Sequence, residues 1–328
     1  MKVLVTGATG FVGGWLVRRL VERGVSVRAY RRSAEPIQEF QQLKVEEQLG
    51  PLTDVEALTQ AMKGCHSVFH LAGLVGYSKS MHRAMREANV KGTAAVVEAC
   101  QRANVERLLH FSSVVAIGAS FNPEVILDET SPYNLSHLNL GYFETKHQAE
   151  QLVLQAVTQK KLNAVIVNPS TIYGAGDSRK GSRSVQLKVA RGKFPFYTSG
   201  GVNVVHIEDV IEGTLSAWER APSGERYILA GENILIRELF ERIARFAGVK
   251  KPSLYLPNFL VHSLGRTGNG LEQFGLKGPL NSETAWTSTL YHWFSSQKAQ
   301  SQLGFKPRPA DEALRESIEW SQRHGLIS

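Results

Sequence analysis

The stretch TGATGFVG at residues 6–13 constrains the fold of this chain more than any other feature. It places Gly7, Gly10 and Gly13 between the β-branched run KVLVT and an apolar pattern of helical spacing. A strand, a glycine loop and a helix in this order let the backbone approach a pyrophosphate closely, and the N–H groups at the helix N-terminus face the anion. The context predicts a dinucleotide-binding unit at the start of the chain.

Short β-branched runs alternate with helical patterns through the first half of the chain. The runs expected to form strands are residues 2–6, 26–30, 67–72, 107–113 and 163–168. This alternation is typical of α/β proteins, so we expect a Rossmann-type, doubly wound parallel sheet with helices on both faces. The tail beyond residue 232 has mainly helical patterns and predicts a smaller, mainly helical substrate-binding domain.

The expected domain boundaries follow from this change of pattern. We expect the cofactor domain to cover residues 1–168 and to be joined again by a segment near residues 202–230. The remaining segments, 169–201 and 231–328, would form the C-terminal substrate domain.

Composition excludes several function classes. The net charge of +8 comes from basic residues spread along the chain, without a helix-turn-helix, zinc-finger or RNA-binding signature, so no nucleic-acid partner is expected. Cys65 and Cys100 lie far apart without a metal-ligand or redox-pair spacing, which suits a reducing cytoplasm and predicts no metal site.

No apolar run is long enough to predict a membrane span. The most apolar late segment, LYLPNFLVHSLG at residues 254–265, is short and contains a proline. We expect it to be a buried part of the substrate domain, with peripheral membrane docking as the alternative.

Arg31 and Arg32 follow the second expected strand, where an acidic residue would bind the adenosine ribose of NAD. Arginine instead offers a planar fork for the 2′-phosphate of NADP. The pair therefore favours NADP(H) over NAD(H); the alternative is two solvated surface charges.

Tyr142 and Lys146, in YFETK, have the i, i+4 spacing that places two side chains on one helix face. A nearby ammonium is expected to lower the pKa of the tyrosine, which would make it a proton donor to a ketone. Ser112 and Ser113 end the fourth expected strand, at the sheet edge where such folds bind ligands, and a serine there would hold the carbonyl oxygen.

These motifs, together with VFHLAG, ANVKGT, VNPSTIYG and the closing LGFKPRP, give the chain a family resemblance over nearly its whole length. The chain resembles the extended short-chain dehydrogenases/reductases, the NAD-dependent epimerase/dehydratase family. Within them it is similar to the dihydroflavonol 4-reductase-like branch, which includes proteins named hopanoid-associated sugar epimerases.

The resemblance implies roles for individual residues. Ser113, rather than Ser112, would complete a catalytic triad with Tyr142 and Lys146, and Asn89 would hold a water near the lysine. The implied cofactor contacts are Gly7, Thr9, Gly10, Phe11, Val12, Arg31, Arg32, Leu52, Leu71, Ala72, Gly73, Tyr142, Lys146, Pro169 and Ser170. The implied substrate pocket contains Val75, Tyr77, Ser113 and Arg179.

One departure from the family pattern concerns the adenine. Many relatives have Gly-Asp-Leu where this chain has Gly50, Pro51 and Leu52, so the aspartate that would bind the adenine amino group is absent. We expect cofactor binding to depend more strongly on the phosphate.

The expected function is that of an NADP-dependent oxidoreductase that interconverts a small-molecule ketone or aldehyde and its alcohol. One alternative is a nucleotide-sugar epimerase or dehydratase with retained NAD, in which Arg179, Lys180 and Arg183 would bind a diphosphate. Another is a non-catalytic NADP-sensing protein. The resemblance also implies a possible homodimer through the helix of Tyr142.

Overall fold

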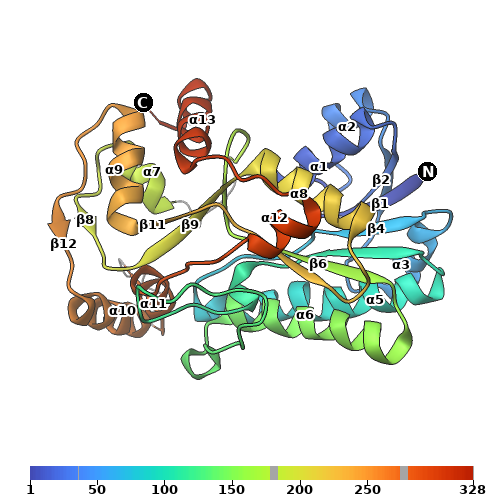
Figure 1. Cartoon of the computed structure of the whole chain (residues 1–328), viewed down its shortest axis with the longest axis horizontal. Helices are drawn as coiled ribbons and strands as arrows, with labels where there is room; N and C mark the ends of the chain where they lie inside the picture. Colours follow the sequence, from blue (N-terminus) through green and yellow to red (C-terminus); the bar gives the residue numbers. More distant parts are fainter. Residues whose placement is uncertain (36, 178–183, 274–279, 328) are drawn as a thin grey trace.

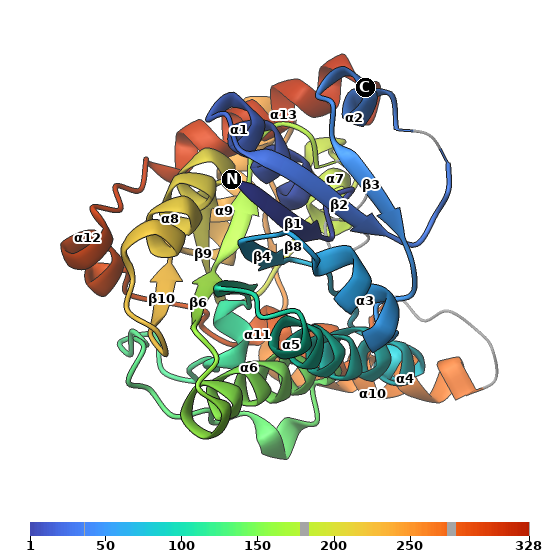
Figure 2. The same cartoon turned by 90° about the vertical axis from the view of Figure 1, so that its right-hand side faces the viewer.

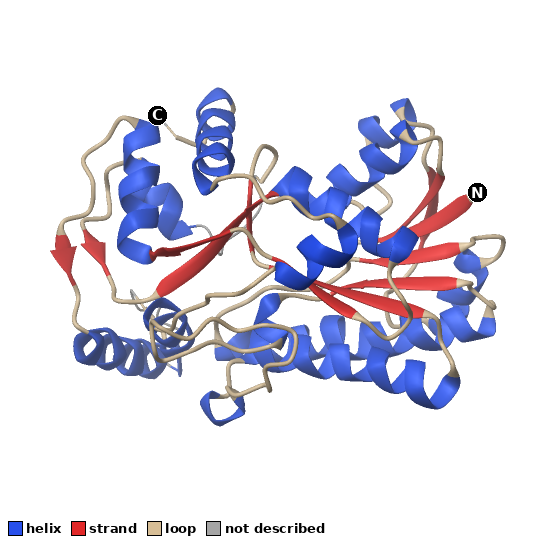
Figure 3. Cartoon of the chain, viewed as in Figure 1, coloured by secondary structure: helices blue, strands red, loops and turns tan. Residues whose placement is uncertain are grey.

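The computed structural model describes residues 1–35, 37–177, 184–273 and 280–327. A large sheet with the N-terminus occupies one end of the molecule, and a smaller group of helices and short strands occupies the other (Figure 1). Figure 3 shows the same division by element type, with helices on both sides of the large sheet.

The large sheet is parallel and has seven strands. Its spatial order is β10 (Arg226–Leu229), β6 (Ala164–Pro169), β5 (Arg107–Phe111), β4 (Ser67–His70), β1 (Lys2–Thr6), β2 (Ser26–Arg31) and β3 (Glu46–Leu49). The order reverses between β1 and β4, and the carboxyl ends of the strands meet at one edge. Such a switch point is where open α/β sheets bind their ligands.

Side chains alternate between the two faces of the sheet, and each face carries its own core. On one face, Val3 and Val5 pack with α1 (Phe11–Glu22) and α8 (Ile207–Arg220). On the other face, Leu4 packs with α3, α5 and α6, which Figure 2 shows together below the sheet. The bounds of these three helices are Val55–Met62, Gly92–Arg102 and Gly141–Lys160.

The predicted fold class is confirmed. The five expected strands correspond to β1, β2, β4, β5 and β6, and the run ERYILAG contains β10. The sequence did not predict β3, whose residues EEQL are mostly exposed at the sheet edge and lack the apolar alternation of a half-buried strand.

The C-terminal group is built around a second, smaller sheet. Its strands are β11 (Glu232–Leu235), β9 (Gly201–His206) and β7 (Thr171–Tyr173), and β12 (Leu254–Tyr255) pairs separately with β8 (Phe196–Tyr197). The helices of this group are α7 (Ser184–Ala190), α9 (Ile236–Ala247), α10 (Asn258–Gln273), α11 (Ser282–Thr289) and α13 (Ala310–Arg323). Of the segment 202–230, α8 covers the large sheet and β10 joins it, whereas β9 pairs in the small sheet.

The remaining elements are short. They are α2 (Gln38–Gln42), η1 (Lys79–Met81), α4 (His82–Met85), the π-helical segment η2 (Arg86–Lys91), η3 (Val114–Ala116), η4 (Ser136–Leu138) and α12 (Gln297–Leu303). In the part of the chain described here, no helix combines the length and apolarity needed to span a membrane.

The expectation that residues 254–265 are buried is wrong. Leu254, Tyr255, Phe259, Leu260 and Leu264 are all exposed, and in α10 Val261 supplies a buried side chain. The sequence pattern does not separate these positions, because apolar residues lie on both the inner and the outer face of this helix.

Candidate active site

The loop after β1 brings its backbone close to neighbouring elements. Gly7 has a φ of +73°, and a Cβ there would lie 2.7 Å from the amide nitrogen of Ala72. A Cβ on Gly13 would lie 2.1 Å from the carbonyl oxygen of Gly7, so α1 packs directly on the loop. Gly10 precedes α1 and provides no side-chain cap for it, an arrangement in which the N-terminus of a helix can receive an anion.

The other residues predicted around this loop lie at the same sheet edge. Thr9 is exposed, and Phe11 and Val12 are half-buried at the start of α1. Past the end of β4, the amide of Leu71 donates to the carbonyl of Thr6, and that of Ala72 to the Thr6 hydroxyl, both at 3.2 Å. The next residue, Gly73, is exposed.

The two arginines after β2 have different surroundings. Arg31 is buried; its side chain forms an ion pair with Glu47 of β3 and donates to the carbonyl of Glu35 at 2.8 Å. Arg32 is exposed, and its side chain has no ion pair or hydrogen bond within the described residues. Arg31 therefore organises the turn after β2, and Arg32 is the guanidinium available to a ligand.

The segment after β3 contributes backbone and apolar groups. The hydroxyl of Tyr30 donates to the carbonyl of Pro51 at 3.0 Å, and a Cβ on Gly50 would collide with this hydroxyl. The side chain of Leu52 packs against Gly92 of α5, where a Cβ would lie 2.6 Å from the leucine. This turn is thus fixed by packing.

The predicted triad residues converge at the carboxyl end of β5. Tyr142 and Lys146 lie one turn apart on α6, and Ser113 follows β5. Ser113 lies beside Tyr142, where its hydroxyl lowers the pKa of the phenol, and it also caps η3, where its hydroxyl accepts from the amide of Val115 at 3.4 Å. The hydroxyl of Ser112 is buried and has no partner among the described residues. The structure therefore places Ser113, and not Ser112, beside the tyrosine.

Burial dominates the electrostatics of this site. It raises the pKa of Tyr142 to about 12, opposed by the hydrogen bond with Ser113. Burial also lowers the pKa of Lys146 to about 8, and the carboxylate of Glu150 opposes this change. The expected lowering of the tyrosine pKa by the lysine is not found, because desolvation is the larger effect and the lysine Nζ donates instead to the carbonyl of Phe111 at 2.8 Å.

Glu150 and Asn168 support the site and were not predicted as its members. Glu150 is fully buried and pairs with Arg226 at 2.9 Å. The amide of Asn168 donates to Glu150 at 2.7 Å and to the carbonyl of Ser113 at 3.0 Å. The i, i+4 spacing of Lys146 and Glu150 was the available signal for the first of these residues.

Asn89 is a positioning residue in this arrangement. Its Oδ1 accepts from the amide of Leu74 at 2.7 Å, and its Nδ2 donates to the carbonyl of Leu74 and to the Thr145 hydroxyl, both at 3.0 Å. Thr145 lies between the tyrosine and the lysine on α6. Because both amide hydrogens are used by protein atoms, Asn89 links the segment after β4 to α6. That Asn89 also holds a water near the lysine stays a prediction.

Two buried histidines lie beside Lys146. The ring of His70 is hydrogen-bonded to Thr6 at 2.8 Å and to Thr93 at 3.0 Å. His110, its neighbour in the sheet, has no hydrogen-bond partner among the described residues. Burial and the lysine charge hold the pKa of His110 well below its ordinary value, so this ring is neutral.

The segment after β6 offers one further polar group. Pro169 ends β6, and the amide of Ser170 donates to the carbonyl of Leu229 at 3.1 Å. The hydroxyl of Ser170 is buried without a partner among the described residues. A buried hydroxyl of this kind is suited to a polar ligand group.

The substrate side of the site is formed by aromatic and apolar groups. The rings of Tyr77 and Tyr142 pack edge to face, with their centroids 6.2 Å apart. Trp286 of α11 belongs to the same apolar cluster. Val75 is exposed. Arg179, Lys180 and Arg183 lie outside the described residues.

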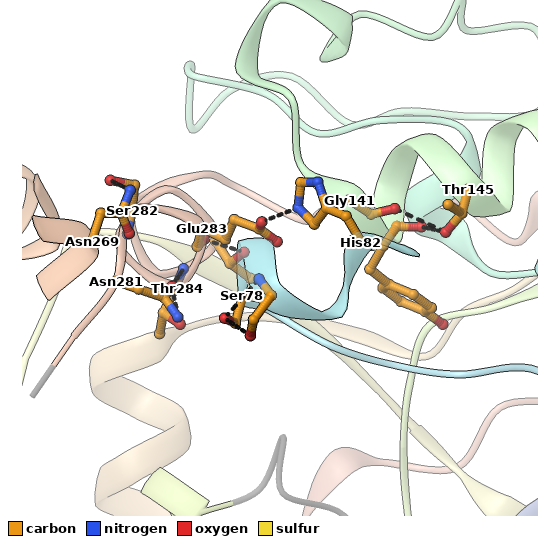
Figure 4. Close-up of polar contacts among 12 residues, drawn as sticks. Ser78, His82, Gly141, Thr145, Asn269, Asn281, Ser282, Glu283 and Thr284 are labelled. Carbon is orange, nitrogen blue, oxygen red and sulfur yellow. Dashed lines mark hydrogen bonds and ion pairs between the residues drawn. The ribbon is translucent and has the colours of Figure 1, made fainter. Parts of the chain in front are cut away.

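Figure 4 shows how the two parts of the chain meet at His82 and Glu283, next to Gly141 at the start of α6. The Nε2 of His82, on α4, forms a hydrogen bond with the buried carboxylate of Glu283 on α11. The same ring packs on Gly141, where a Cβ would lie 2.4 Å from it. The helix α6, which carries Tyr142, therefore begins against a contact with the C-terminal helices, which the sequence did not predict.

These features fit a nicotinamide dinucleotide. The uncapped N-terminus of α1 and the loop closed to side chains at Gly7 and Gly13 suit a pyrophosphate. The unpaired hydroxyl of Ser170 lies after β6, and the triad residues follow or face β5.

Comparison with known proteins supports the same family. Residues 3–230 match the family model described as "NAD dependent epimerase/dehydratase family". A Synechocystis protein provisionally named dihydroflavonol 4-reductase is 32% identical over 98% of this chain and 95% of its own.

A second relative and one solved structure extend this comparison. The 4-hydroxy-2-methyl-3-oxo-4-farnesyl-3,4-dihydroquinoline-1-oxide ketoreductase of Stigmatella aurantiaca is 34% identical over 83% of this chain and 80% of its own. The crystal structure of gox2253 superposes with a TM-score of 0.88 at 37% identity, covering 100% of this chain and 99% of the other.

Proposed function

The chain belongs to the NAD dependent epimerase/dehydratase family, and we propose that it is an NADP-dependent reductase that interconverts a ketone or aldehyde and the corresponding alcohol. The observation that carries this proposal is the contact between Ser113 and Tyr142 at the carboxyl end of β5, with Lys146 one helical turn away. Members of this family bind nicotinamide dinucleotides, and the bound nicotinamide supplies or accepts the hydride.

In the reducing direction, Ser113 and Tyr142 hold the substrate carbonyl oxygen by donating hydrogen bonds to it. The high pKa of Tyr142 keeps its phenol protonated at neutral pH, which is the form that donates a proton to the developing alkoxide. Lys146, whose ammonium donates to the carbonyl of Phe111 one helical turn from the tyrosine, would bind the ribose of the nicotinamide cofactor. Asn89 and Asn168 position the backbone near these groups, because they donate to the carbonyls of Leu74 and Ser113.

The large sheet forms the cofactor half of the proposed enzyme. The first turn of α1 would bind the pyrophosphate. The nicotinamide half would lie along Leu71, Ala72, Gly73, Pro169 and Ser170. Arg32 would bind the 2′-phosphate, and Arg31, which pairs with Glu47 and donates to the carbonyl of Glu35, would position the turn that carries Arg32. This assignment refines the expected pair, because Arg31 already uses its Nε and Nη1 donors within the protein.

The substrate class follows from the surroundings of Tyr142. The apolar cluster of Tyr77, Leu138 and Trp286 beside it favours a ketone with an apolar substituent. One relative is named for a ketone that carries a farnesyl chain.

Titration of purified protein with NADPH and NADH tests the cofactor assignment. We expect wild type to prefer NADPH, and Arg32→Ala to weaken NADPH binding by at least about tenfold while leaving NADH binding unchanged, as the loss of a charge-assisted phosphate contact of about 1.5 to 3 kcal/mol requires. The matched control is Arg315→Ala, an exposed arginine of α13 that should leave both affinities unchanged. Tighter binding of NADH by wild type, or retained NAD with no net turnover, would favour a sugar epimerase instead.

A further inference from the structure

The outer face of β12 and α10 is an exposed apolar surface with a basic rim. The exposed fractions are 52% for Leu254, 49% for Tyr255, 68% for Phe259, 41% for Leu260 and 43% for Leu264. These five residues are called the α10 face below. We propose that the α10 face docks this protein on an anionic lipid bilayer. This proposal does not depend on the proposed reaction.

The inner side of α10 prevents these side chains from turning toward the core. Val261 is buried, and a Cβ on Gly265 would lie 2.8 Å from the Cβ of Ala285 on α11. A Cβ on Gly268 would lie 1.7 Å from the carbonyl oxygen of Leu280. Because the two glycines hold α10 closely against α11, the rotation of the helix is fixed and the apolar side chains remain in solvent.

The exposed residues of α10 fall on one side of the helix. Leu260 and Leu264 are one turn apart, and Phe259 precedes them on the same exposed arc. Only two residues separate β12, which contains Leu254 and Tyr255, from the start of α10. Phenylalanine, leucine and an interfacial tyrosine on one face are the residue types that lie in the boundary layer of a bilayer.

The charges around this face select the kind of surface that binds it. Residues 250–270 contain Lys250, Lys251 and Arg266 and no acidic residue. Lys250 and Arg266 are exposed and have no ion pair within the described part of the chain, whereas Lys251 pairs with Glu241 at 3.0 Å. Basic residues near an anionic leaflet strengthen binding to it. The charge therefore complements an anionic lipid surface.

Figure 1 places β12 and α10 at the end of the molecule away from the N-terminus, where they can meet a flat surface. Aromatic side chains connect this end of the molecule to the surroundings of Tyr142. His262 of α10 contacts the ring of Trp286 at 4.1 Å, and Trp286 shares an apolar cluster with Tyr142. A bilayer bound to the α10 face would therefore lie at the end of the molecule where α10 and α11 connect, through Trp286, to the apolar cluster beside Tyr142.

Flotation of the full-length protein with lipid vesicles tests the proposal. Wild type is expected to float with vesicles of phosphatidylcholine and phosphatidylglycerol, and to bind vesicles of phosphatidylcholine alone more weakly. The variant Phe259→Ser with Leu264→Ser should reduce binding to the anionic vesicles by at least about tenfold, since two exposed apolar side chains are lost without a change in the core. Lys250→Gln with Arg266→Gln should reduce the preference for anionic vesicles.

The matched control is Val125→Ser with Ile126→Ser, two exposed apolar residues outside the α10 face, which should bind as wild type does. Wild type that fails to bind anionic vesicles, or serine variants that bind as well as wild type, would overturn the proposal. A wild-type dimer that the Phe259→Ser, Leu264→Ser variant converts to monomer, without vesicle binding, would assign the face to a second copy instead. Turnover of a water-soluble ketone should be unchanged in every variant, so this outcome is separate from that of the proposed reaction.

Discussion

Lys146→Met should stabilise the folded protein while removing its activity. Burial lowers the pKa of Lys146 from 10.5 to about 8, and at about 1.4 kcal/mol per tenfold change in acidity, the protonated lysine costs the folded protein about 3 kcal/mol at neutral pH. Methionine has a similar length and no charge to desolvate. It loses the hydrogen bond to the carbonyl of Phe111, which contributes about 1 kcal/mol. The expected net gain in the free energy of unfolding at pH 6 to 7 is about 2 kcal/mol.

The gain should depend on pH in a defined direction. The lysine pKa is lower in the folded protein than in the unfolded one, so between pH 8 and 10.5 the unfolded state holds a proton that the folded state has lost. Wild-type stability relative to the variant therefore rises with pH across this window, and the advantage of Lys146→Met shrinks from its full value below pH 8.

Urea denaturation of both proteins at pH 6, 8 and 9.5 measures this difference. The control Lys306→Met replaces an exposed lysine and should change stability little at any of these pH values. A Lys146→Met variant that is less stable than wild type at pH 6, or whose advantage is as large at pH 9.5, would refute the view that desolvation of the lysine is the dominant effect.

Three further substitutions test the geometry of the site. Gly13→Ala places a Cβ against the loop backbone and should weaken NADPH binding by roughly tenfold or more in a fluorescence titration, whereas Gly14→Ala, which faces open space, should not. Gly141→Ala pushes a Cβ into the ring of His82 and should lower kcat by roughly tenfold or more, because the helix that carries Tyr142 is displaced; an unchanged kcat would show that this contact is dispensable. Asn89→Leu leaves the carbonyl of the segment after β4 unpaired and should lower the free energy of unfolding by about 1 to 3 kcal/mol in urea denaturation; equal stability would contradict its positioning role.

The sequence predicted the elements whose signal is local. The glycine spacing, the β-branched runs and the i, i+4 spacing of Tyr142 and Lys146 each depend on neighbouring residues, and the structure contains the corresponding loop, strands and helix face. The choice of Ser113 over Ser112 came from the family resemblance, and it agrees with the hydrogen bond to Tyr142.

What the sequence did not predict depends on residues far apart in the chain. The ion pair of Arg31 requires Glu47, which lies on the edge strand β3. The sequence did not predict this strand, because its residues are mostly polar. The raised pKa of Tyr142 results from burial by the whole fold, which no spacing reveals. The exposure of α10 depends on which of its faces the neighbouring helix covers, and that is decided by close packing at Gly265 and Gly268.

The transfer of deuterium from stereospecifically 4-deuterated NADPH to a ketone tests the central claim most directly. For wild type and Ser112→Ala, we predict that deuterium appears on the carbinol carbon of the alcohol for one of the two NADPH stereoisomers, with one NADPH consumed per alcohol formed. Tyr142→Phe and Ser113→Ala should lower the rate by about 100-fold or more, as the loss of a proton donor or a carbonyl-binding group requires. Near-normal transfer by Tyr142→Phe, or no transfer by wild type to any member of a panel of alkyl, aryl and alicyclic ketones, would contradict the account.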